Sequence, residues 1–522
     1  MTACRVVAVV AAGFLALAAS SAGAGESPRA QVQGTSEALA GLPAPKQFVS
    51  HHEVTIGGRE VAFTATAGEI YIFNDRGEPI ATMFSYAFMK DGAEPGRPVL
   101  FVLPGGPGGA TLVGVGLFGP WRVKMAHGGD GGLPRSVPPF EIEDNPNSLL
   151  DVADLVFIDP VGTGYSRIVG SGKPEDFYGI DADIDVAGQF VEQWLVKNNR
   201  WNSPHFLTGE SYGGLRAAIY PRAFNGDVTS GLIRGITFNG VIPIANTLGY
   251  PGYGDEGLGP VLAAATELPS YAVAAWHHQT IDRKGRSLEA YHDEAYRFAV
   301  GPYATALRKE AARTLTVDER RQVVARLVAF TGLPASAFDK KLALDVDQFT
   351  KLLLASRGLK IASYDSRVTS PLKGGGPDPV GDDAALAREF PIGLGGYRLV
   401  EHDKLAISMD RPFVSQDFRN VAMRWNTKRK PMALGGDNFK FAAQELESAM
   451  VLNDDLRVLN VAGYFDLVMP TAQARLAAEM AGLPVARTSV NFYKSGHMQV
   501  GGAATAKVAD DVRDFIRRSS QR

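Results

Sequence analysis

The sequence predicts a protein of the α/β class, with a mixed, mostly parallel central sheet flanked by helices and a mainly helical insertion before its last strands. Two observations predict it. Most β-type segments are short apolar runs without alternation, as expected for strands buried on both faces of a parallel sheet. Segments with the spacing of amphipathic helices lie between them. Because strands and helices alternate along the chain, we expect helices on both faces of the sheet.

The first part of the chain has the features of an export signal. Arg5 is followed by the almost wholly apolar stretch 6–19 and then by small residues, with a small-x-small pattern at 22–24. We therefore predict a signal peptide over residues 1–24 and a secreted or periplasmic protein. Residues 25–48 are polar, small and proline-containing, which is typical of a flexible tether. No later apolar run is long enough for a membrane helix, so no stable membrane insertion is expected after cleavage.

Composition narrows the classes of function. The formal net charge is −3, which gives no reason to expect nucleic acid as a partner. The single cysteine, Cys4, precedes the apolar stretch, so the mature protein is expected to contain no disulfide, no catalytic thiol and no cysteine-bound zinc. The sequence contains no HExxH zinc motif. We expect neither a metal nor a cofactor, and the oligomeric state stays open.

The elements of the predicted core, residues 49–242 and 435–522, follow in order. Three predicted strands open it: residues 54–56 and 60–65 alternate like half-exposed strands, and residues 83–89 resemble a third. The buried strands are then expected at 99–103, 155–158, 205–208, 236–238, 456–462 and 490–493. Between them, residues 183–197 place Ile184, Ala187, Val191 and Leu195 on one face of a helix.

The regular succession of strand-like segments is interrupted over residues 243–434, where we predict a helical cap insertion. Helices are expected at 288–313, 316–330 and 345–357. The second begins with Thr316-Val-Asp-Glu319, the pattern of a capping box. Strand character returns only near residue 456, so the insertion interrupts the sheet late in the chain.

One short segment predicts the chemistry. Gly209-Glu-Ser-Tyr-Gly213 matches G-x-S-x-G between a predicted strand and a helix that begins near Leu215. In this context the serine sits on a sharp, strained turn that displays its Oγ above the sheet. The five-residue pattern is common by chance, but its place between strand and helix favours Ser211 as a nucleophile over an ordinary glycine-rich turn.

A serine nucleophile needs a base, and the base needs an orienting acid. Asp466 follows the predicted strand 456–462, and His497 follows the predicted strand 490–493. Active-site groups of open α/β sheets gather at the carboxyl ends of the strands. The order Ser211, Asp466, His497 along the chain is the order expected of a serine hydrolase with this kind of turn.

A glycine-rich turn after an early strand predicts the oxyanion hole. The strand 99–103 runs directly into Pro104-Gly-Gly-Pro-Gly-Gly109. Glycines allow the backbone to approach a substrate carbonyl closely. We expect the N–H groups of Gly106 and Tyr212 to form the oxyanion hole and Gly105 to contact the substrate.

Five blocks of the sequence resemble the serine carboxypeptidase family of the α/β-hydrolase superfamily, in a bacterial-type form without disulfides. The blocks occur in the family's order, within residues 80–240 and 430–515, and the predicted cap lies where the family carries its own. They are LPGGPGG (103–109), NSLLDVADLVFIDPVGTGYS (147–166), GESYGG (209–214), VAGYFDLVMP (461–470) and SGHMQV (495–500).

The resemblance implies an α/β-hydrolase fold and an enzyme that releases C-terminal residues from peptides through a Ser-His-Asp acyl-enzyme mechanism. It also implies that Glu210, which precedes the serine, is protonated and hydrogen-bonds the terminal carboxylate of the peptide. A glutamate that meets another carboxylate in a secluded site must have a raised pKa, because two nearby negative charges repel.

Two positions depart from the family pattern. Pro104 stands where the family has an asparagine that helps to hold the terminal carboxylate, and Leu117 stands where it has an acidic helper. Proline has no N–H to donate. Other groups from the insertion replace these side chains, or the enzyme is not a strict exopeptidase. An esterase, an acyltransferase or an aminopeptidase on the same triad is the alternative; a binding protein without catalysis fits less well, because all three triad residue types are present.

Overall fold

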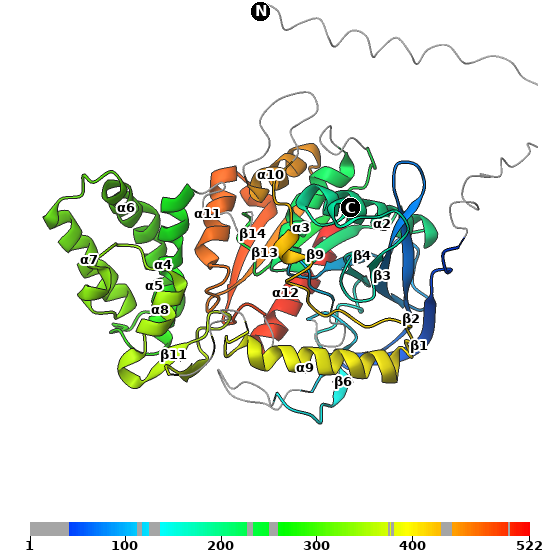
Figure 1. The fold of residues 1–522 in the computed structure, drawn as a ribbon, viewed down its shortest axis with the longest axis horizontal. Helices are drawn as coiled ribbons and strands as arrows, with labels where there is room; N and C mark the ends of the chain where they lie inside the picture. Colours follow the sequence, from blue (N-terminus) through cyan, green and yellow to red (C-terminus); the bar gives the residue numbers. More distant parts are fainter. Residues whose placement is uncertain are drawn as a thin grey trace, which may run out of the picture. The chain divides into compact units, whose positions relative to one another are not determined.

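Figure 1 shows a computed structural model of the chain. It describes residues 41–111, 117–124, 136–226, 233–249, 259–373, 376, 381–429, 441–498 and 502–521. The predicted signal peptide, 1–24, and most of the predicted tether lie outside the described residues. Residues 42–522 form one compact unit. Within the part of the chain that the structure describes, no helix is long and apolar enough to cross a membrane.

The centre of the fold is a ten-stranded mixed sheet. Its order is β1-β2-β3-β7-β4-β9-β10-β13-β14, and β8 pairs with β3. The pairs from β1 to β7 are antiparallel, and those from β7 to β14 are parallel. The strands are β1 (Gln47–Ile56), β2 (Arg59–Phe73), β3 (Pro79–Lys90), β4 (Val99–Leu103), β7 (Asp154–Asp159), β8 (Arg167–Ile168), β9 (His205–Glu210), β10 (Gly240–Ile244), β13 (Arg457–Gly463) and β14 (Thr488–Tyr493). This is the mixed, mostly parallel sheet that the sequence predicts.

Both faces of the parallel strands are buried, which explains their unbroken apolar runs. Val99 and Phe101 of β4 belong to one hydrophobic core, and Leu100 between them belongs to another. The first core includes residues of α2 (Ile180–Lys197), α3 (Tyr212–Asn225), α10 (Ala442–Leu452) and α11 (Thr471–Ala481). The second includes residues of α9 (Leu386–Leu399) and α12 (Gly502–Ser520). Burial of each large apolar side chain contributes about 1.5–3 kcal/mol, so this two-sided packing holds the sheet.

One predicted strand is wrong. Residues 236–238 are not part of the sheet, and the strand that follows β9 begins four residues later as β10. Ile236 and Phe238 are buried, as their apolar character requires. However, the N–H of Ile236 bonds to the carbonyl of Phe224 at the end of α3. Burial beside a helix and burial in a strand leave the same short apolar run in the sequence.

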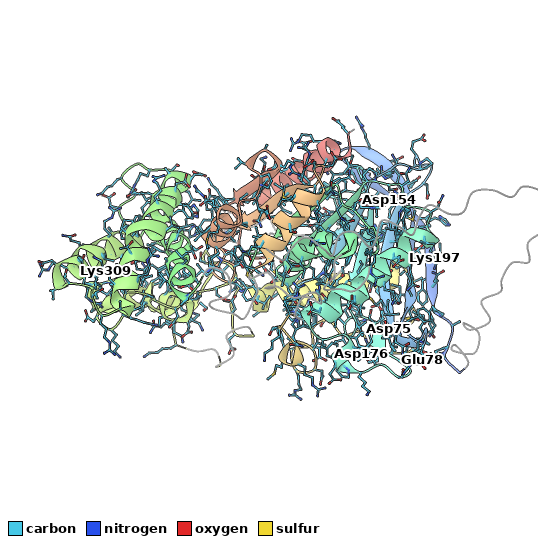
Figure 2. The ribbon with its side chains drawn as sticks, turned by 90° about the horizontal axis from the view of Figure 1, so that it is seen from above. Asp75, Glu78, Asp154, Asp176, Lys197 and Lys309 are labelled. Atoms are coloured by element: carbon cyan, nitrogen blue, oxygen red, sulfur yellow. The ribbon has the colours of Figure 1, made fainter. Side chains whose placement is uncertain are left out.

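Five helices between β10 and β13 share a hydrophobic core of their own. They are α4 (Gly259–His277), α5 (Leu288–Phe298), α6 (Ala304–Ala311), α7 (Val317–Thr331) and α8 (Val346–Leu352). These helices, drawn in green in Figure 1, lie together beside α11, and α4 contacts α11. Figure 2 shows Lys309 of α6 within this group. The helical character of the insertion is as predicted, but α4 and α9 were not predicted.

Local sequence explains the details of these helices. The predicted helix 288–313 is interrupted by a π-helical turn, η2 (Ala299–Tyr303), which contains Pro302. Proline has no N–H for the helical ladder, so the register changes there. The capping box of α7 is confirmed: Glu319 N donates to Thr316 Oγ1 (3.3 Å) and Thr316 N donates to Glu319 Oε2 (3.0 Å). The predicted helix 345–357 is α8 followed by the 3₁₀ turn η4 (Ala355–Arg357).

The remaining short elements of the described residues are two small ladders and five further turns. The ladders are β5 (Trp121–Val123) with β6 (Ile142–Asp144), and β11 (Leu359–Ile361) with β12 (Thr369–Pro371). The turns are η1 (Pro174–Asp176), η3 (Ala335–Phe338), η5 (Val400–Lys404), η6 (Ala422–Arg424) and η7 (Val485–Arg487).

Candidate active site

Ser211 forms the turn between β9 and α3. Its backbone has φ 57° and ψ −120°, a conformation that a residue with a side chain adopts at a free-energy cost of about 1–3 kcal/mol. Four hydrogen bonds hold it there. Ser211 N donates to Ile244 O (2.9 Å), and Ser211 O accepts from Gly214 N (2.9 Å), Asn246 Nδ2 (2.9 Å) and Leu215 N (3.4 Å). The turn is therefore over-determined by its surroundings, as the strained serine turn of a hydrolase requires.

The glycines around this turn are dictated by close packing. A Cβ on Gly209 would lie 2.4 Å from the carbonyl oxygen of Gly213. One on Gly213 would lie 2.2 Å from the carbonyl oxygen of Leu103. A Cβ on Gly105 would come within 3.3 Å of Ser211 Cβ, so the glycine-rich turn after β4 lies directly beside the serine. The packing accounts for the glycines of the G-x-S-x-G pattern.

His497 and Asp466 lie at the same edge of the sheet and are hydrogen-bonded to each other. His497 Nδ1 is 2.8 Å from Asp466 Oδ2, and both side chains are at least 97% buried. Asp466 Oδ1 accepts two further bonds, from the N–H groups of Val468 and Met469 (2.8 Å each). Because the carboxylate can only accept, Nδ1 of the histidine carries a proton and Nε2 is the nitrogen that can act as a base.

The strand register places this pair near the serine turn. Ile244 at the end of β10 is aligned with Glu210 on one side and with Val461 of β13 on the other. Within the part of the chain that the structure describes, no hydrogen bond joins Ser211 Oγ to His497. In apo structures such a bond is often long or poorly aligned and tightens only with substrate.

The environment of His497 raises its pKa. Burial alone lowers it, but the charge and hydrogen bond of Asp466 raise it more, and Glu210 and Glu389 act in the same direction. The backbone N–H of His497 donates to the carbonyl of Tyr364 (2.6 Å), and the two rings meet edge to face at 5.1 Å. A loop of the insertion thus holds the histidine in place.

The glycine-rich turn 104–109 is held by a mostly irregular segment of the insertion that was not predicted. We call residues 405–429 the strap. Ala110 N donates to Ser415 O of the strap, and Asp417 N donates to Gly108 O (2.9 Å each). Gly106 has φ +121°, where a Cβ would meet the nitrogen of Gly108 at 2.6 Å. The turn expected to supply the N–H group of Gly106 therefore lies between Ser211 and the strap.

Two glutamates with raised pKa values lie near the histidine. The Glu210 residue is partly exposed, but its Oε1 atom is buried and has no hydrogen-bond partner among the described residues. Burial raises its pKa to about 7; the charge of His497 opposes this shift and that of Asp466 adds to it. Glu389, in the first turn of α9, has a pKa of about 8 because of burial and then the charges of Asp365 and Glu210. The site therefore holds two carboxyl groups that stay protonated well above pH 5.

The sequence analysis did not predict Glu389 as a site residue, and hydrogen bonds of Asp383 explain its position. Asp383 Oδ2 accepts from Ser363 N (2.6 Å) and Ser363 Oγ (2.9 Å), and Asp383 Oδ1 accepts from Leu386 N (3.2 Å). Asp383 thus joins the start of α9 to the loop whose next residue, Tyr364, holds His497. No local sequence pattern predicts this arrangement, because it depends on two segments of the insertion that are separated in sequence.

Comparison with known proteins agrees with the motifs. The family model for serine carboxypeptidase matches residues 59–510. A search of curated proteins finds no match.

Three similar solved structures are a juvenile hormone epoxide hydrolase, a feruloyl esterase and a brefeldin A esterase. The first, from the silkworm Bombyx mori, has a TM-score of 0.33 at 11% identity and covers 88% of this chain and 79% of its own. Feruloyl esterase B from Aspergillus oryzae has 0.30 at 13%, covering 88% and 80%. Brefeldin A esterase, a bacterial homologue of human hormone sensitive lipase, has 0.31 at 11%, covering 87% and 77%. These likenesses are too distant to carry an argument. The match to the family model spans most of the chain and includes every motif described above, so the chain belongs to the serine carboxypeptidase family of α/β-hydrolases.

Proposed function

We propose that the protein is an exported serine carboxypeptidase that releases C-terminal residues from peptides through an acyl-enzyme on Ser211. One observation carries the proposal: a hydrogen-bonded His497–Asp466 pair at the sheet edge that also presents the strained serine turn. This is the arrangement of an activated nucleophile, with the base oriented by a third group.

The chemistry follows from the roles of the three groups. Ser211 Oγ attacks the carbonyl carbon of the scissile peptide bond while Nε2 of His497 takes its proton. The N–H groups of Gly106 and Tyr212 stabilise the negative charge on the carbonyl oxygen. His497 then returns the proton to the leaving amine, and water attacks the acyl-enzyme by the same route to regenerate the serine. Asp466 keeps the imidazole in the required tautomer and stabilises its positive charge.

The two glutamates support recognition of a free C-terminus. Below a pH of about 7 both Glu210 and Glu389 are largely protonated and can each donate a hydrogen bond to the terminal carboxylate of a peptide. The N–H of Gly105 is a further donor in the same turn. Glu389 of the insertion would thus supply the acidic helper that is absent at Leu117. The side-chain donor that the family has at the position of Pro104 would then not be needed.

A second candidate deserves a test because of the same carboxyl groups. When ionised, Glu210 and Glu389 would bind the ammonium group of a peptide N-terminus, which is the requirement of an aminopeptidase. Their raised pKa values favour the carboxypeptidase below neutral pH, because the protonated forms carry no charge with which to hold an ammonium group. An esterase or acyltransferase would need neither recognition and would act on blocked substrates equally well.

Blocked peptides separate these functions. One peptide is prepared in three forms, with both ends free, with an acetylated N-terminus and with an amidated C-terminus. Mass spectrometry after incubation should show residues lost from the C-terminus of the first two forms, with the amide cleaved more slowly. Loss of N-terminal residues, abolished by acetylation, would instead support the aminopeptidase. Cleavage of small esters without any peptide trimming would support the esterase.

Export is part of the proposal and has its own test. The apolar stretch 6–19 and the small residues at 22–24 support a cleaved signal peptide and a secreted or periplasmic enzyme whose partners are peptides. N-terminal sequencing of the protein recovered from an expressing bacterium should begin at residue 25. A chain that retains Met1 and stays in the cytoplasm would contradict it.

A further inference from the structure

A buried arginine on the nucleophile helix joins three elements of the site. Arg216 of α3 is 1% exposed and forms a two-pronged ion pair with Asp183 of α2: Nε lies 2.7 Å from Oδ2, and Nη2 lies 3.1 Å from Oδ1. Tyr220 OH donates to the same carboxylate (2.7 Å). A fork-shaped pair of this kind fixes both the position and the plane of the guanidinium.

The remaining arm of the guanidinium reaches the glycine-rich turn. Arg216 Nη1 donates to the carbonyl oxygen of Pro104 (2.8 Å). Pro104 is the first residue of the turn, directly after β4. In a trans peptide unit the carbonyl and the following N–H point in opposite directions. The bond from Arg216 therefore also sets the direction of the Gly105 N–H, one residue before Gly106.

Two aromatic rings, one of them from the strap, also pack against the guanidinium group of Arg216. Its guanidinium carbon lies 4.9 Å from the ring centre of Tyr212 and 5.8 Å from that of Trp425. Trp425 Nε1 donates to the hydroxyl of Tyr212 (2.7 Å), and the two rings meet edge to face. Arg216 is thus in contact with Tyr212, whose N–H is expected in the oxyanion hole, and with Pro104, two residues before Gly106.

We propose that Arg216 is a positioning residue that holds the turn 104–106 and the start of α3 in the geometry needed to bind the oxyanion. It contacts no reacting atom itself. The proposal rests on the proposed nucleophile Ser211 and the adjacent N–H groups, but not on which end of a peptide the enzyme cleaves. A displacement of about 1 Å in such a turn is enough to lower turnover by about 10²-fold.

The test compares Arg216→Lys with a matched substitution at a buried arginine elsewhere. Arg200 also pairs with a buried aspartate, Asp154, and donates to a backbone carbonyl, that of Arg97. Asp154 begins β7 and is aligned with the first residue of β4, so this cluster lies at the opposite edge of the sheet from Pro104; Figure 2 labels Asp154. Arg200→Lys therefore measures how much stability is lost when a buried, ion-paired arginine is replaced far from the expected oxyanion hole.

Three quantities are measured for wild type and both variants. They are kcat and KM for an activated ester, the inhibition constant of an alkylboronic acid that adds to Ser211 Oγ as a tetrahedral adduct, and the melting temperature. We expect Arg216→Lys to lower kcat about 10²-fold with KM within about threefold, because an oxyanion contact acts mainly in the transition state. Boronate binding should weaken in proportion to kcat/KM, while Arg200→Lys leaves both within about threefold.

The outcome is decided by comparison with the control. The proposal is overturned if the fold-loss of kcat in Arg216→Lys is less than ten times the fold-loss in Arg200→Lys. It is also overturned if boronate binding is unchanged in Arg216→Lys. If Arg216→Lys does not fold, Asp183→Asn takes its place, because it loosens the fork while leaving the arginine; the same criterion then applies. Ester hydrolysis that survives Ser211→Ala would instead refute the proposed nucleophile, which separates failure of the function from failure of this inference.

Discussion

The Nδ1 atom of His497 lies 2.8 Å from Oδ2 of Asp466, and the other carboxylate oxygen is occupied by the N–H groups of Val468 and Met469. The backbone of its own loop therefore fixes the aspartate independently of its bond to the histidine. Since Nδ1 is committed to this bond, only Nε2 of the imidazole can serve Ser211. The pair thus orders the histidine in a single tautomer without any contribution from substrate.

Asp466→Asn should abolish most turnover without unfolding the protein. An asparagine amide can donate to Nδ1 and so favours the tautomer with the proton on Nε2, which cannot accept the serine proton. We expect kcat to fall by about 10⁴ with KM little changed. Steady-state kinetics and a melting curve check this together. A fall of less than tenfold in a folded variant would mean that Asp466 does not orient the base.

Glu210→Gln should change the pH profile only for substrates with a free C-terminus. With a pKa of about 7, Glu210 loses its proton above neutral pH, and the resulting charge repels a substrate carboxylate. For such peptides kcat/KM should fall about tenfold per pH unit above pH 7, while the matched ester shows only the acid limb of His497. Glutamine cannot ionise, so the variant should lose the fall between about pH 7 and 8, and only the ionisation of Glu389 above about pH 8 should still weaken binding of the carboxylate. Superimposable profiles for acid and ester substrates in wild type would contradict the role given to Glu210.

Glu389→Gln should alter how stability depends on pH. The pKa of Glu389 is raised to about 8 from an ordinary value of 4.5, so between these values the folded protein keeps a proton that the unfolded chain has lost. Stability therefore falls as pH rises from about 4.5 to 8, because unfolding releases that proton and a higher pH favours its release. Urea unfolding at several pH values should show a shallower fall in Glu389→Gln. The same slope in that variant and in a control at exposed Glu60 would contradict the raised pKa.

Gly213→Ala should disrupt the serine turn. Its Cβ would lie 2.2 Å from the carbonyl oxygen of Leu103, and neither backbone can yield without moving Ser211 or β4. We expect a destabilisation of about 1–3 kcal/mol or more, together with a large loss of turnover. Gly96→Ala is the matched control, because no atom of the described residues lies within 4 Å of a Cβ placed there. Equal stability and activity in the two variants would show that the close packing at Gly213 is not needed.

The triad candidates could be chosen from sequence because each lies just after a strand in a local pattern. Ser211 has glycines on both sides, and Asp466 and His497 each follow an apolar run that becomes β13 or β14. Parallel strands end at the same edge of a sheet, so topology brings these positions to one edge. Their separation in sequence was no obstacle, since strand order rather than chain distance determines which ends meet.

Glu389 and Arg216 could not be chosen in this way. Glu389 reaches the site only because Asp383 ties α9 to the loop at Ser363, two parts of the insertion with no motif of their own. Arg216 resembles any basic residue of a surface helix until the contact between α2 and α3 places Asp183 opposite it. Side chains whose role depends on how two helices cross leave no periodic signal in the sequence.

The assignment of Ser211 as the nucleophile is tested by mapping the residue to which a fluorophosphonate inhibitor attaches. Such a reagent phosphonylates an activated serine with loss of fluoride. Intact mass and peptide mapping should show one adduct per chain, on Ser211, with activity falling in proportion to labelling, and His497→Ala should react at least 10³-fold more slowly. An adduct on another residue, or full activity of a chain labelled at Ser211, would contradict the assignment of Ser211 as the nucleophile.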